Sequence, residues 1–290
     1  MPPWQSHLGT PPCPRAIAVL SCVGHADPHR PGNERSPVNP SPEIWQLLLL
    51  FGIGLVAGVI NVLAGGGSLL TMPLLIFLGL PAAMANGTNR VAILLQNIVA
   101  VQGFRHRGRL PLKPALLGTG PAAVGGVLGA RLALDMDDST FRLVLAGVML
   151  MVAVLMIVDP ARRWRFPAAD LTPRRIVIWV ALFFLVGIYG GFIQAGVGFI
   201  MITGLLAFGL DLVRINAIKV FVVMVFTLCA LPAFAWAGQV NWPLGLTLAA
   251  GNMVGGWLGS QLAVSKGHGW LRKMVLVVTV LLALKLLLWR

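Results

Sequence analysis

The chain has few charged residues, and this scarcity excludes a soluble globular protein. Charged residues make up 11% of its 290 residues, whereas hydrophobic residues make up 57%. A soluble domain carries about 25% charged residues to keep its surface hydrated. The composition therefore indicates an integral membrane protein, in which 34 glycines and 20 prolines are tolerated because small residues permit close helix packing.

Acidic residues are the scarcest charged type. There are nine, and none is expected in the middle of a hydrophobic segment. A transporter of Na⁺ or H⁺ needs carboxylates embedded in the membrane. The five histidines all lie in the N-terminal region or in predicted loops, so a proton relay through the core has no visible carrier. The pattern disfavours a cation transporter.

Other functional groups are missing as well. The three cysteines suggest neither a disulfide framework nor a metal site. The chain has no GxxxxGK[ST] motif for ATP, and its hydrophobic segments offer only Ser68, Lys219 and Cys229, widely spaced, for catalysis. We therefore expect no enzyme activity, no catalytic or metal site and no cofactor. The net charge of +13 sits largely in short loops, so we expect no nucleic-acid partner.

The sequence contains ten apolar segments. Eight of them are about long enough to span about 30 Å of hydrocarbon as helices. The other two, 68–80 and 199–210, are short, and each follows a glycine cluster. We expect an all-α, polytopic transmembrane bundle of about eight full spans and two glycine-broken half-helices. If each broken pair forms one span, the chain crosses the membrane eight times instead of ten. The predicted segments are 44–63, 68–80, 83–104, 114–134, 141–158, 176–194, 199–210, 213–235, 243–264 and 271–289.

The two halves of the chain resemble each other. Asn86 matches Asn216 and Val124–Gly129 matches Val254–Gly259, both at an offset of 130 residues. One offset across several segments indicates a tandem duplication with five segments per half, and an odd number inserts the second half upside down. We expect repeat 1 at 44–159, a basic cytoplasmic linker at 160–175 and repeat 2 at 176–290.

Loop charges predict the orientation. Basic residues crowd the loops at 105–113, 162–175 and 266–273, which share one side under the ten-segment count. That side is predicted to be cytoplasmic, with both termini outside. The eight-crossing count would move the loop holding Lys266 to the other side. Tryptophans near segment ends are predicted interfacial anchors, and glycines four residues apart, such as Gly54 with Gly58 and Gly125 with Gly129, are predicted helix-packing faces.

Residues 1–43 have no helical period and are rich in Pro, Ser, His and Arg. Their apolar patch, Ala16–Val23, is short and precedes His, Asp and Pro, which does not match a signal peptide. A disordered tail or a wrongly assigned start accounts for this composition. The hypothesis that we favour starts translation at Val38, read as a GTG codon.

The glycine breaks are candidate binding elements. Short, glycine-interrupted segments at matching places in two halves mark transport sites. Ser68 begins a helix after Gly65-Gly66-Gly67, and a helix N-terminus presents unpaired N–H groups that suit an anion. Gly198 repeats this arrangement, and Asn61 and Gln194 stand just before the breaks. We expect Gly66 and Gly67 to let the backbone turn, so that the N–H groups at Ser68 and beyond face the anion. The alternative is a tight hairpin that needs glycine only for its backbone freedom.

Two basic residues are predicted about six residues inside their helices. Arg90 follows Asn86-Gly87-Thr88-Asn89, and Lys219 follows Asn216-Ala217-Ile218. A membrane-embedded cation costs about 2.5–3.5 kcal/mol, so it usually serves a ligand or a partner carboxylate, and no carboxylate is expected at that depth. The alternative is snorkelling to the interface, which is the interpretation we prefer for Arg131, Arg142, Arg214 and Lys285, closer to segment ends. The predicted substrate-binding residues are Asn61, Gly65, Gly66, Gly67, Ser68, Asn86, Thr88, Asn89, Arg90, Gln194, Gly196, Gly198, Asn216 and Lys219.

These features predict a secondary transporter or facilitator of a small anion, or alternatively an assembly or accessory subunit without transport activity. A known family shares three stretches with the chain: Gly58-Val-Ile-Asn61-Val-Leu-Ala64-Gly-Gly-Gly67-Ser-Leu-Leu-Thr-Met-Pro73-Leu-Leu, Gly79-Leu-Pro81 and Ala85-Asn-Gly-Thr88-Asn. They resemble the sulfite exporter TauE/SafE family, also called the toluene sulfonate uptake permease family, over about residues 46–289. The resemblance implies a multi-pass permease of the bacterial inner membrane for small sulfur anions such as sulfite, sulfonates or sulfoacetate. The expected partners are this anion and the lipid bilayer, with a homodimer as a possibility.

Overall fold

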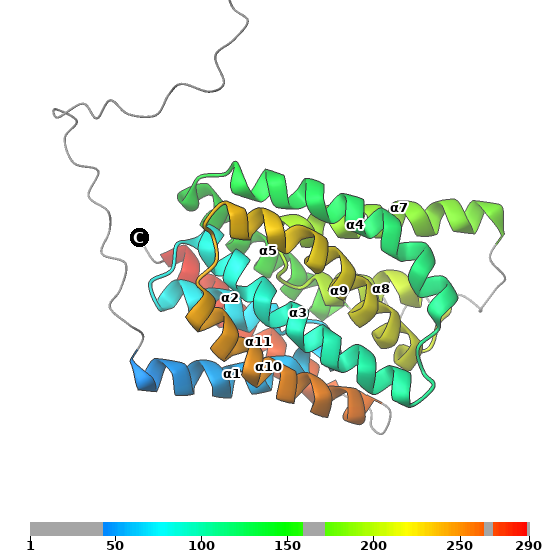
Figure 1. Cartoon of the computed structure of the whole chain (residues 1–290), viewed down its shortest axis with the longest axis horizontal. Helices are drawn as coiled ribbons and strands as arrows, with labels where there is room; N and C mark the ends of the chain where they lie inside the picture. The colour runs from blue at the N-terminus through cyan, green and yellow to red at the C-terminus, as the bar shows by residue number, and fades with distance from the viewer. Residues whose placement is uncertain (1–42, 159–171, 264–268, 289–290) are drawn as a thin grey trace, which may run out of the picture. The chain divides into compact units, whose positions relative to one another are not determined.

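Helices account for all regular structure in the residues that the computed structural model describes, 43–158, 172–263 and 269–288 (Figure 1). These residues belong to one unit of the chain, Ser41–Arg290. The predicted tail or alternative start at 1–43, apart from Glu43, and the linker at 160–175, apart from its last four residues, lie outside the described residues.

Ten helices occupy the described residues, and they follow the ten predicted segments with boundaries that differ by a few residues. The two helices that begin after the glycine breaks, α2 and α8, are ten residues long. Their bounds are α1 (Ile44–Ala64), α2 (Ser68–Phe77), α3 (Ala82–His106), α4 (Leu112–Leu134), α5 (Asp138–Val158), α7 (Pro173–Phe192), α8 (Val197–Leu206), α9 (Leu212–Trp236), α10 (Trp242–Ala263) and α11 (Gly269–Leu288).

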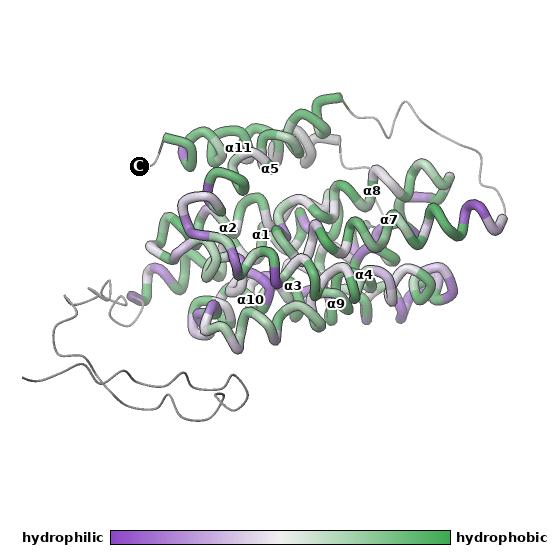
Figure 2. The backbone as a smooth tube through the Cα atoms, turned by 90° about the horizontal axis from the view of Figure 1, so that it is seen from above, coloured by the Kyte–Doolittle hydropathy of each residue, from purple (hydrophilic) through white to green (hydrophobic). Residues whose placement is uncertain are grey.

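Five of these helices, α1, α4, α5, α7 and α9, are long and apolar enough to cross a membrane. Figure 2 shows that hydrophobic residues dominate along most of the helices. Large apolar side chains such as Leu143 and Leu185 are more than 60% exposed, which suits contact with lipid acyl chains. The all-α class is confirmed for the described residues, whereas the number of eight full spans stays a prediction.

Helices from the two halves of the chain pack on each other. α1 packs mainly on α10 and α4 mainly on α7, while α3 and α9 contact each other between these pairs (Figure 1). A Cβ atom on Gly58 would lie 2.5 Å from the carbonyl oxygen of Asn252, and one on Gly129 would lie 2.0 Å from that of Ile188. The predicted packing role of these glycines is therefore confirmed, because no larger residue fits at such backbone distances.

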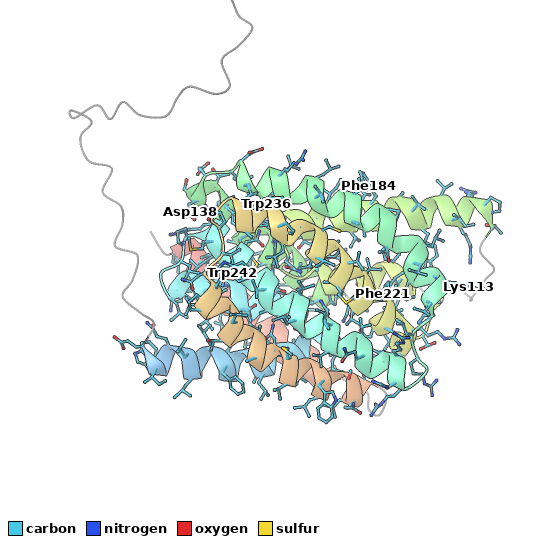
Figure 3. The ribbon with its side chains drawn as sticks, in the orientation of Figure 1. Lys113, Asp138, Phe184, Phe221, Trp236 and Trp242 are labelled. Atoms are coloured by element: carbon cyan, nitrogen blue, oxygen red, sulfur yellow. The ribbon has the colours of Figure 1, made fainter. Side chains whose placement is uncertain are left out.

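Charged and aromatic side chains mark the two ends of the helices. Figure 3 shows Lys113 at one end of the helices and Asp138, Trp236 and Trp242 at the other. Trp236 is 89% exposed and Trp242 48% exposed, as expected for interfacial anchors. Trp179 is 2% exposed, so the prediction that it anchors the interface is wrong. Its ring packs instead against Phe183 and Phe208, with both pairs of ring centroids 5.0 Å apart.

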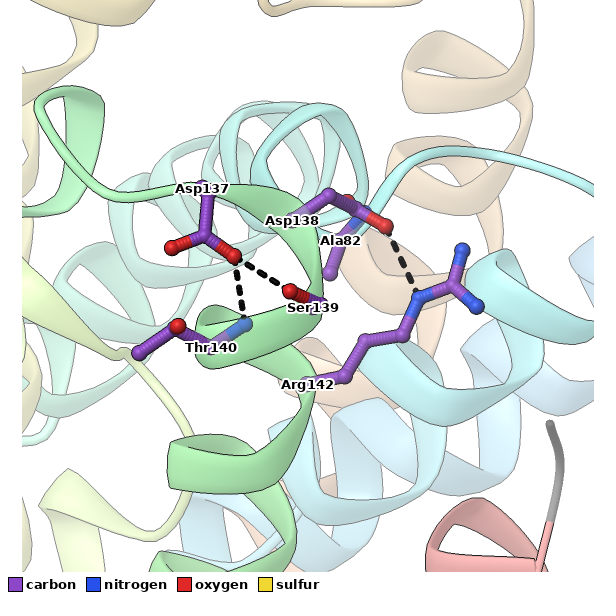
Figure 4. A network of polar contacts seen from close by, with 6 residues as sticks. All are labelled: Ala82, Asp137, Asp138, Ser139, Thr140 and Arg142. Atoms are coloured by element: carbon purple, nitrogen blue, oxygen red, sulfur yellow. Dashed lines mark hydrogen bonds and ion pairs between the residues drawn. The ribbon is translucent and has the colours of Figure 1, made fainter.

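Acidic residues organise the start of α5 (Figure 4). Asp138 accepts a hydrogen bond from the amide of Ala82 at the start of α3 and forms a 2.9 Å ion pair with Arg142. Asp137 caps α5 by accepting from the Ser139 hydroxyl and, at 2.9 Å, from the Thr140 amide. Hydrogen bonds, first that of Ser139 and then those of the Thr140 backbone and side chain, lower the pKa of Asp137 from its ordinary value of 3.8 to about 2.

Three of the four residues predicted to snorkel also have protein partners, and their snorkelling stays a prediction. Arg142 pairs with Asp138, as above, and Arg214 forms a 3.1 Å ion pair with Asp211. The Lys285 ammonium lies 4.4 Å from the centre of the Phe77 ring. Arg131 is exposed near the end of α4, which fits the prediction.

Candidate functional site

Each glycine break contains one residue in the left-handed backbone region. Gly65, after the last residue of α1, has φ 76°, and Gly196, before the first residue of α8, has φ 72°. L-residues with a side chain rarely adopt this region, so both turns require glycine. The sequence interpretation assigned the turn to Gly66 and Gly67. That assignment is wrong for Gly67, which has φ −57° and ψ −40°, an ordinary helical conformation.

The two breaks contact each other. A Cβ atom on Gly65 would lie 2.2 Å from the carbonyl carbon of Gly198, and one on Gly198 would lie 2.6 Å from the Cα atom of Gly65. Gly67 is enclosed too, since its Cβ would lie 2.3 Å from the carbonyl oxygen of Ala57 in α1. Because the breaks meet, the first turns of α2 and α8 converge on one region of the protein.

Lys219 of α9 binds the end of α1. Its ammonium donates to the carbonyl oxygens of Asn61 and Val62, both at 2.8 Å, and to Oδ1 of Asn216 at 3.0 Å. The last carbonyls of a helix carry partial negative charge, so a cation there is stabilised. Lys219 is 2% exposed, and the snorkelling alternative is therefore wrong for it.

Arg90 of α3 does the same for α7. Its guanidinium donates to the carbonyl of Gly190 at 3.1 Å and to that of Gly191, while Asn86 donates to the carbonyl of Phe192 at 2.8 Å. The guanidinium carbon also lies 4.4 Å from the centre of the Phe234 ring. Arg90 is fully buried, so it does not snorkel either. Each cation thus caps the helix that ends at the glycine break of the other half of the chain.

A small cavity lies where the breaks meet. The part of it that the centre of a water molecule can occupy is about 10 Å³, enough for about one water. Five of the fourteen predicted residues line this cavity: Asn61, Ser68, Gln194, Gly198 and Lys219. Their convergence from α1, α2, α8, α9 and the second break brings together residues up to 158 positions apart in the chain.

The other predicted residues, all within the described part of the chain, do not line the cavity. Several have internal partners that explain their polarity. Thr71 donates to Oδ1 of Asn89 at 2.6 Å, and the hydroxyl oxygen of Thr88 accepts from the Asn241 amide at 2.9 Å. These bonds hold α2 and the loop before α10 against α3.

The amide groups predicted as donors beside the breaks are also engaged within the protein. Nδ2 of Asn61 donates to Oε1 of Gln96 at 3.3 Å, and Nε2 of Gln194 donates to the hydroxyl of Thr227 at 2.7 Å. Tyr189 adds a third bond near the second break by donating to the Ala195 carbonyl at 2.6 Å. The breaks are therefore held in place by polar side chains from α3, α7 and α9.

Sequence reasoning missed four residues that line the cavity. Ile93, Val197 and Val223 form apolar parts of its wall, and Asn97 of α3 adds a polar group. The apolar residues carry no distinguishing signal in an apolar segment. Asn97 does, because it is a polar residue in the middle of a predicted transmembrane segment.

Comparison with known proteins identifies the family. The model of the family described as "Sulfite exporter TauE/SafE" matches residues 50–286. The chain belongs to the TauE/SafE family. The match covers nine of the ten described helices in full or nearly so, and both glycine breaks lie inside it.

Relatives of this TauE/SafE protein are similar over most of their length. A probable membrane transporter protein, ORF9, of Sinorhizobium sp is 28% identical over 83% of this chain and 92% of its own. A probable membrane transporter protein of Haemophilus influenzae is 29% identical, with coverage of 83% and 94%, and the probable membrane transporter protein YfcA of Escherichia coli K12 is 28% identical, with coverage of 82% and 88%. No solved structure matches the chain. The family and the apolar helices together make this a multi-pass membrane protein of a transporter family.

Proposed function

We propose that the protein is a secondary transporter or facilitator that carries a small anion across the bacterial inner membrane. The anion is a sulfur-containing oxyanion or an organosulfonate, and it binds between the paired helix breaks. The observation that carries this proposal is that Lys219, Ser68 and Gly198 line one cavity. This cavity brings the buried ammonium of Lys219 next to the first turns of α2 and α8.

The charges around the cavity favour an anion over a cation. The N-termini of α2 and α8 bring partial positive charge to the region where the breaks meet. Lys219 adds a full positive charge, and no carboxylate is among the lining residues, all of which are described. A sodium ion or proton would need acidic ligands at this depth.

Lys219 also links anion binding to the first break. All three of its N–H bonds are used, two on α1 carbonyls and one on Asn216. An anion that reaches the ammonium must replace one of these acceptors. The Asn216 side chain rotates away more easily than the α1 backbone, so the anion takes its place first. The ammonium then shifts toward the anion, which weakens its bonds to the α1 carbonyls and lets α1 and α2 move relative to α9.

Opening is required because the cavity described here admits about one water molecule. We propose that the two halves are inverted repeats that rock about the contact between Gly65 and Gly198. The reciprocal packing of α1 on α10 and of α4 on α7 supports this, as does the reciprocal capping by Lys219 and Arg90. The end of the helices that bears Lys113 faces the cytoplasm in this proposal.

Flux measurements in proteoliposomes test the function. Purified protein should carry radiolabelled sulfite or methanesulfonate at a saturable rate, without ATP, and protein-free liposomes should not. An assembly subunit would show no flux for either anion in either direction. Association into homodimers is a separate prediction, checked by mass measurement in detergent.

A further inference from the structure

Asn97 is a cavity-lining residue whose polar group is unused by the fold. It lies on α3 and is 1% exposed. Its Nδ2 atom is buried and has no hydrogen-bond partner among the described residues. It lines the same cavity as Lys219 and Ser68. A buried amide donor without a partner destabilises the protein unless another molecule supplies an acceptor.

The corresponding position in the second half makes the contrast clear. Thr227 follows Asn97 by 130 residues, the offset that relates the two halves, and is fully buried on α9. Its hydroxyl accepts the 2.7 Å hydrogen bond from Gln194. At matching positions, therefore, the second half has a hydroxyl that binds Gln194 beside the second break, whereas the first half has an amide donor without a partner.

We propose that Asn97 is a substrate-binding residue, donating from Nδ2 to an oxygen of the anion while Lys219 binds a second oxygen. The proposal rests on the proposed function. The new element is the substrate class, an oxyanion with at least two exposed oxygens. Two oxygens are needed because the two donors come from different helices, α3 and α9. A directional amide donor also favours an oxygen acceptor at a fixed position.

The chain offers a matched control for this role. Asn252 of α10 is also 1% exposed, and both Nδ2 and Oδ1 of its amide lack hydrogen-bond partners in the described part of the chain. It does not line the cavity. Asn97→Leu and Asn252→Leu therefore make the same change in volume and polarity at sites of equal burial.

The test is the concentration dependence of methanesulfonate flux in proteoliposomes. Asn97→Leu should raise the apparent KM about tenfold or more, as expected for loss of a hydrogen bond to a charged group. Asn252→Leu should leave KM within about twofold of wild type. Asn97→Ser, which keeps a hydrogen-bond donor, should raise KM less than Asn97→Leu does.

The outcomes separate this proposal from the broader one. If wild type shows saturable flux and Asn97→Leu and Asn97→Ser keep the wild-type KM, Asn97 does not bind the anion, and the proposed function stands. If wild type shows no saturable flux, both proposals fail. Thermal unfolding in detergent identifies whether Asn97→Leu has failed to fold, and in that case the KM of the Asn97→Ser variant decides.

Discussion

Gly65 and Gly198 contact each other through their backbones, so the two breaks of the chain form a single structural element. The space between them is too small for a methyl group, since a Cβ on Gly65 would lie 2.2 Å from the carbonyl carbon of Gly198. This contact places the ends of α1 and α7 and the starts of α2 and α8 around one region. Function and stability should therefore both depend on it.

Gly65→Ala should abolish flux and lower the thermal unfolding midpoint. The substitution combines the overlap with Gly198 and a left-handed backbone that costs an L-residue about 1–2 kcal/mol. Gly198→Ala should behave similarly. Gly52→Ala is the control, because its Cβ would meet nothing within 4 Å. Gly125→Ala is unsuitable as a mild control, since its Cβ would lie 2.3 Å from the Phe184 carbonyl oxygen. Wild-type flux in Gly65→Ala would show that the breaks tolerate separation.

Arg90→Gln should act first on stability. It leaves the Gly190 and Gly191 carbonyls of α7 without their donors, which should cost about 2 kcal/mol. Arg90→Lys should recover part of this loss, because an ammonium keeps the charge but not the planar pair of donors. Thermal unfolding in detergent measures both variants, with exposed Arg131→Gln as the control. An unchanged midpoint in Arg90→Gln would mean that the capping bonds contribute nothing to stability.

Lys219→Gln should abolish anion flux while the protein still inserts into the membrane. The neutral amide cannot balance the charge of a bound anion in a cavity with no other cation among its lining residues. Arg214→Gln is the control on the same helix, since its side chain is 64% exposed. Equal amounts of protein in the liposomes must be confirmed by quantitative blot. Normal flux by Lys219→Gln would remove Lys219 from the transport pathway.

The lowered pKa of Asp137 predicts that the protein loses stability in acid through the start of α5. The pKa of this carboxyl group falls from 3.8 to about 2 in the folded protein. Its contribution to the free energy of unfolding is therefore present above about pH 3.8 and is lost as the pH falls toward about 2. The unfolding midpoint of wild type should therefore fall more steeply across this window than that of Asp137→Asn. Parallel curves for the two proteins would contradict the capping role of the carboxylate.

The sequence predicts the helices well because the signals for them are local. Long apolar runs set the segments, and glycine clusters set the breaks at Gly65 and Gly196, so the ten helices agree with the ten predicted segments. The convergence of the two breaks, with Asn61 and Gln194 just before them, also follows from the matching glycine clusters of two related halves. These predictions need only periodicity, length and the repeat offset.

The partners of the two cations could not be predicted. Lys219 binds the carbonyls of Asn61 and Val62, and Arg90 binds those of Gly190 and Gly191. Backbone carbonyls are present at every residue, so the sequence has no signal for which ones a cation will cap. Only packing between the halves selects them. Arg90 does not line the cavity whereas Lys219 does, in agreement with the offset of 130 residues, which matches Lys219 with Asn89 and not with Arg90.

The most direct test of the anion site is a crystal structure of the protein grown with selenite, a sulfite analogue whose selenium scatters anomalously. The account predicts an anomalous peak between the two breaks, with an oxygen about 3 Å from the Lys219 ammonium and the Asn216 side chain turned away from it. A peak found only at the exposed basic loop near Lys113, with Lys219 still bound to Asn216, would contradict it.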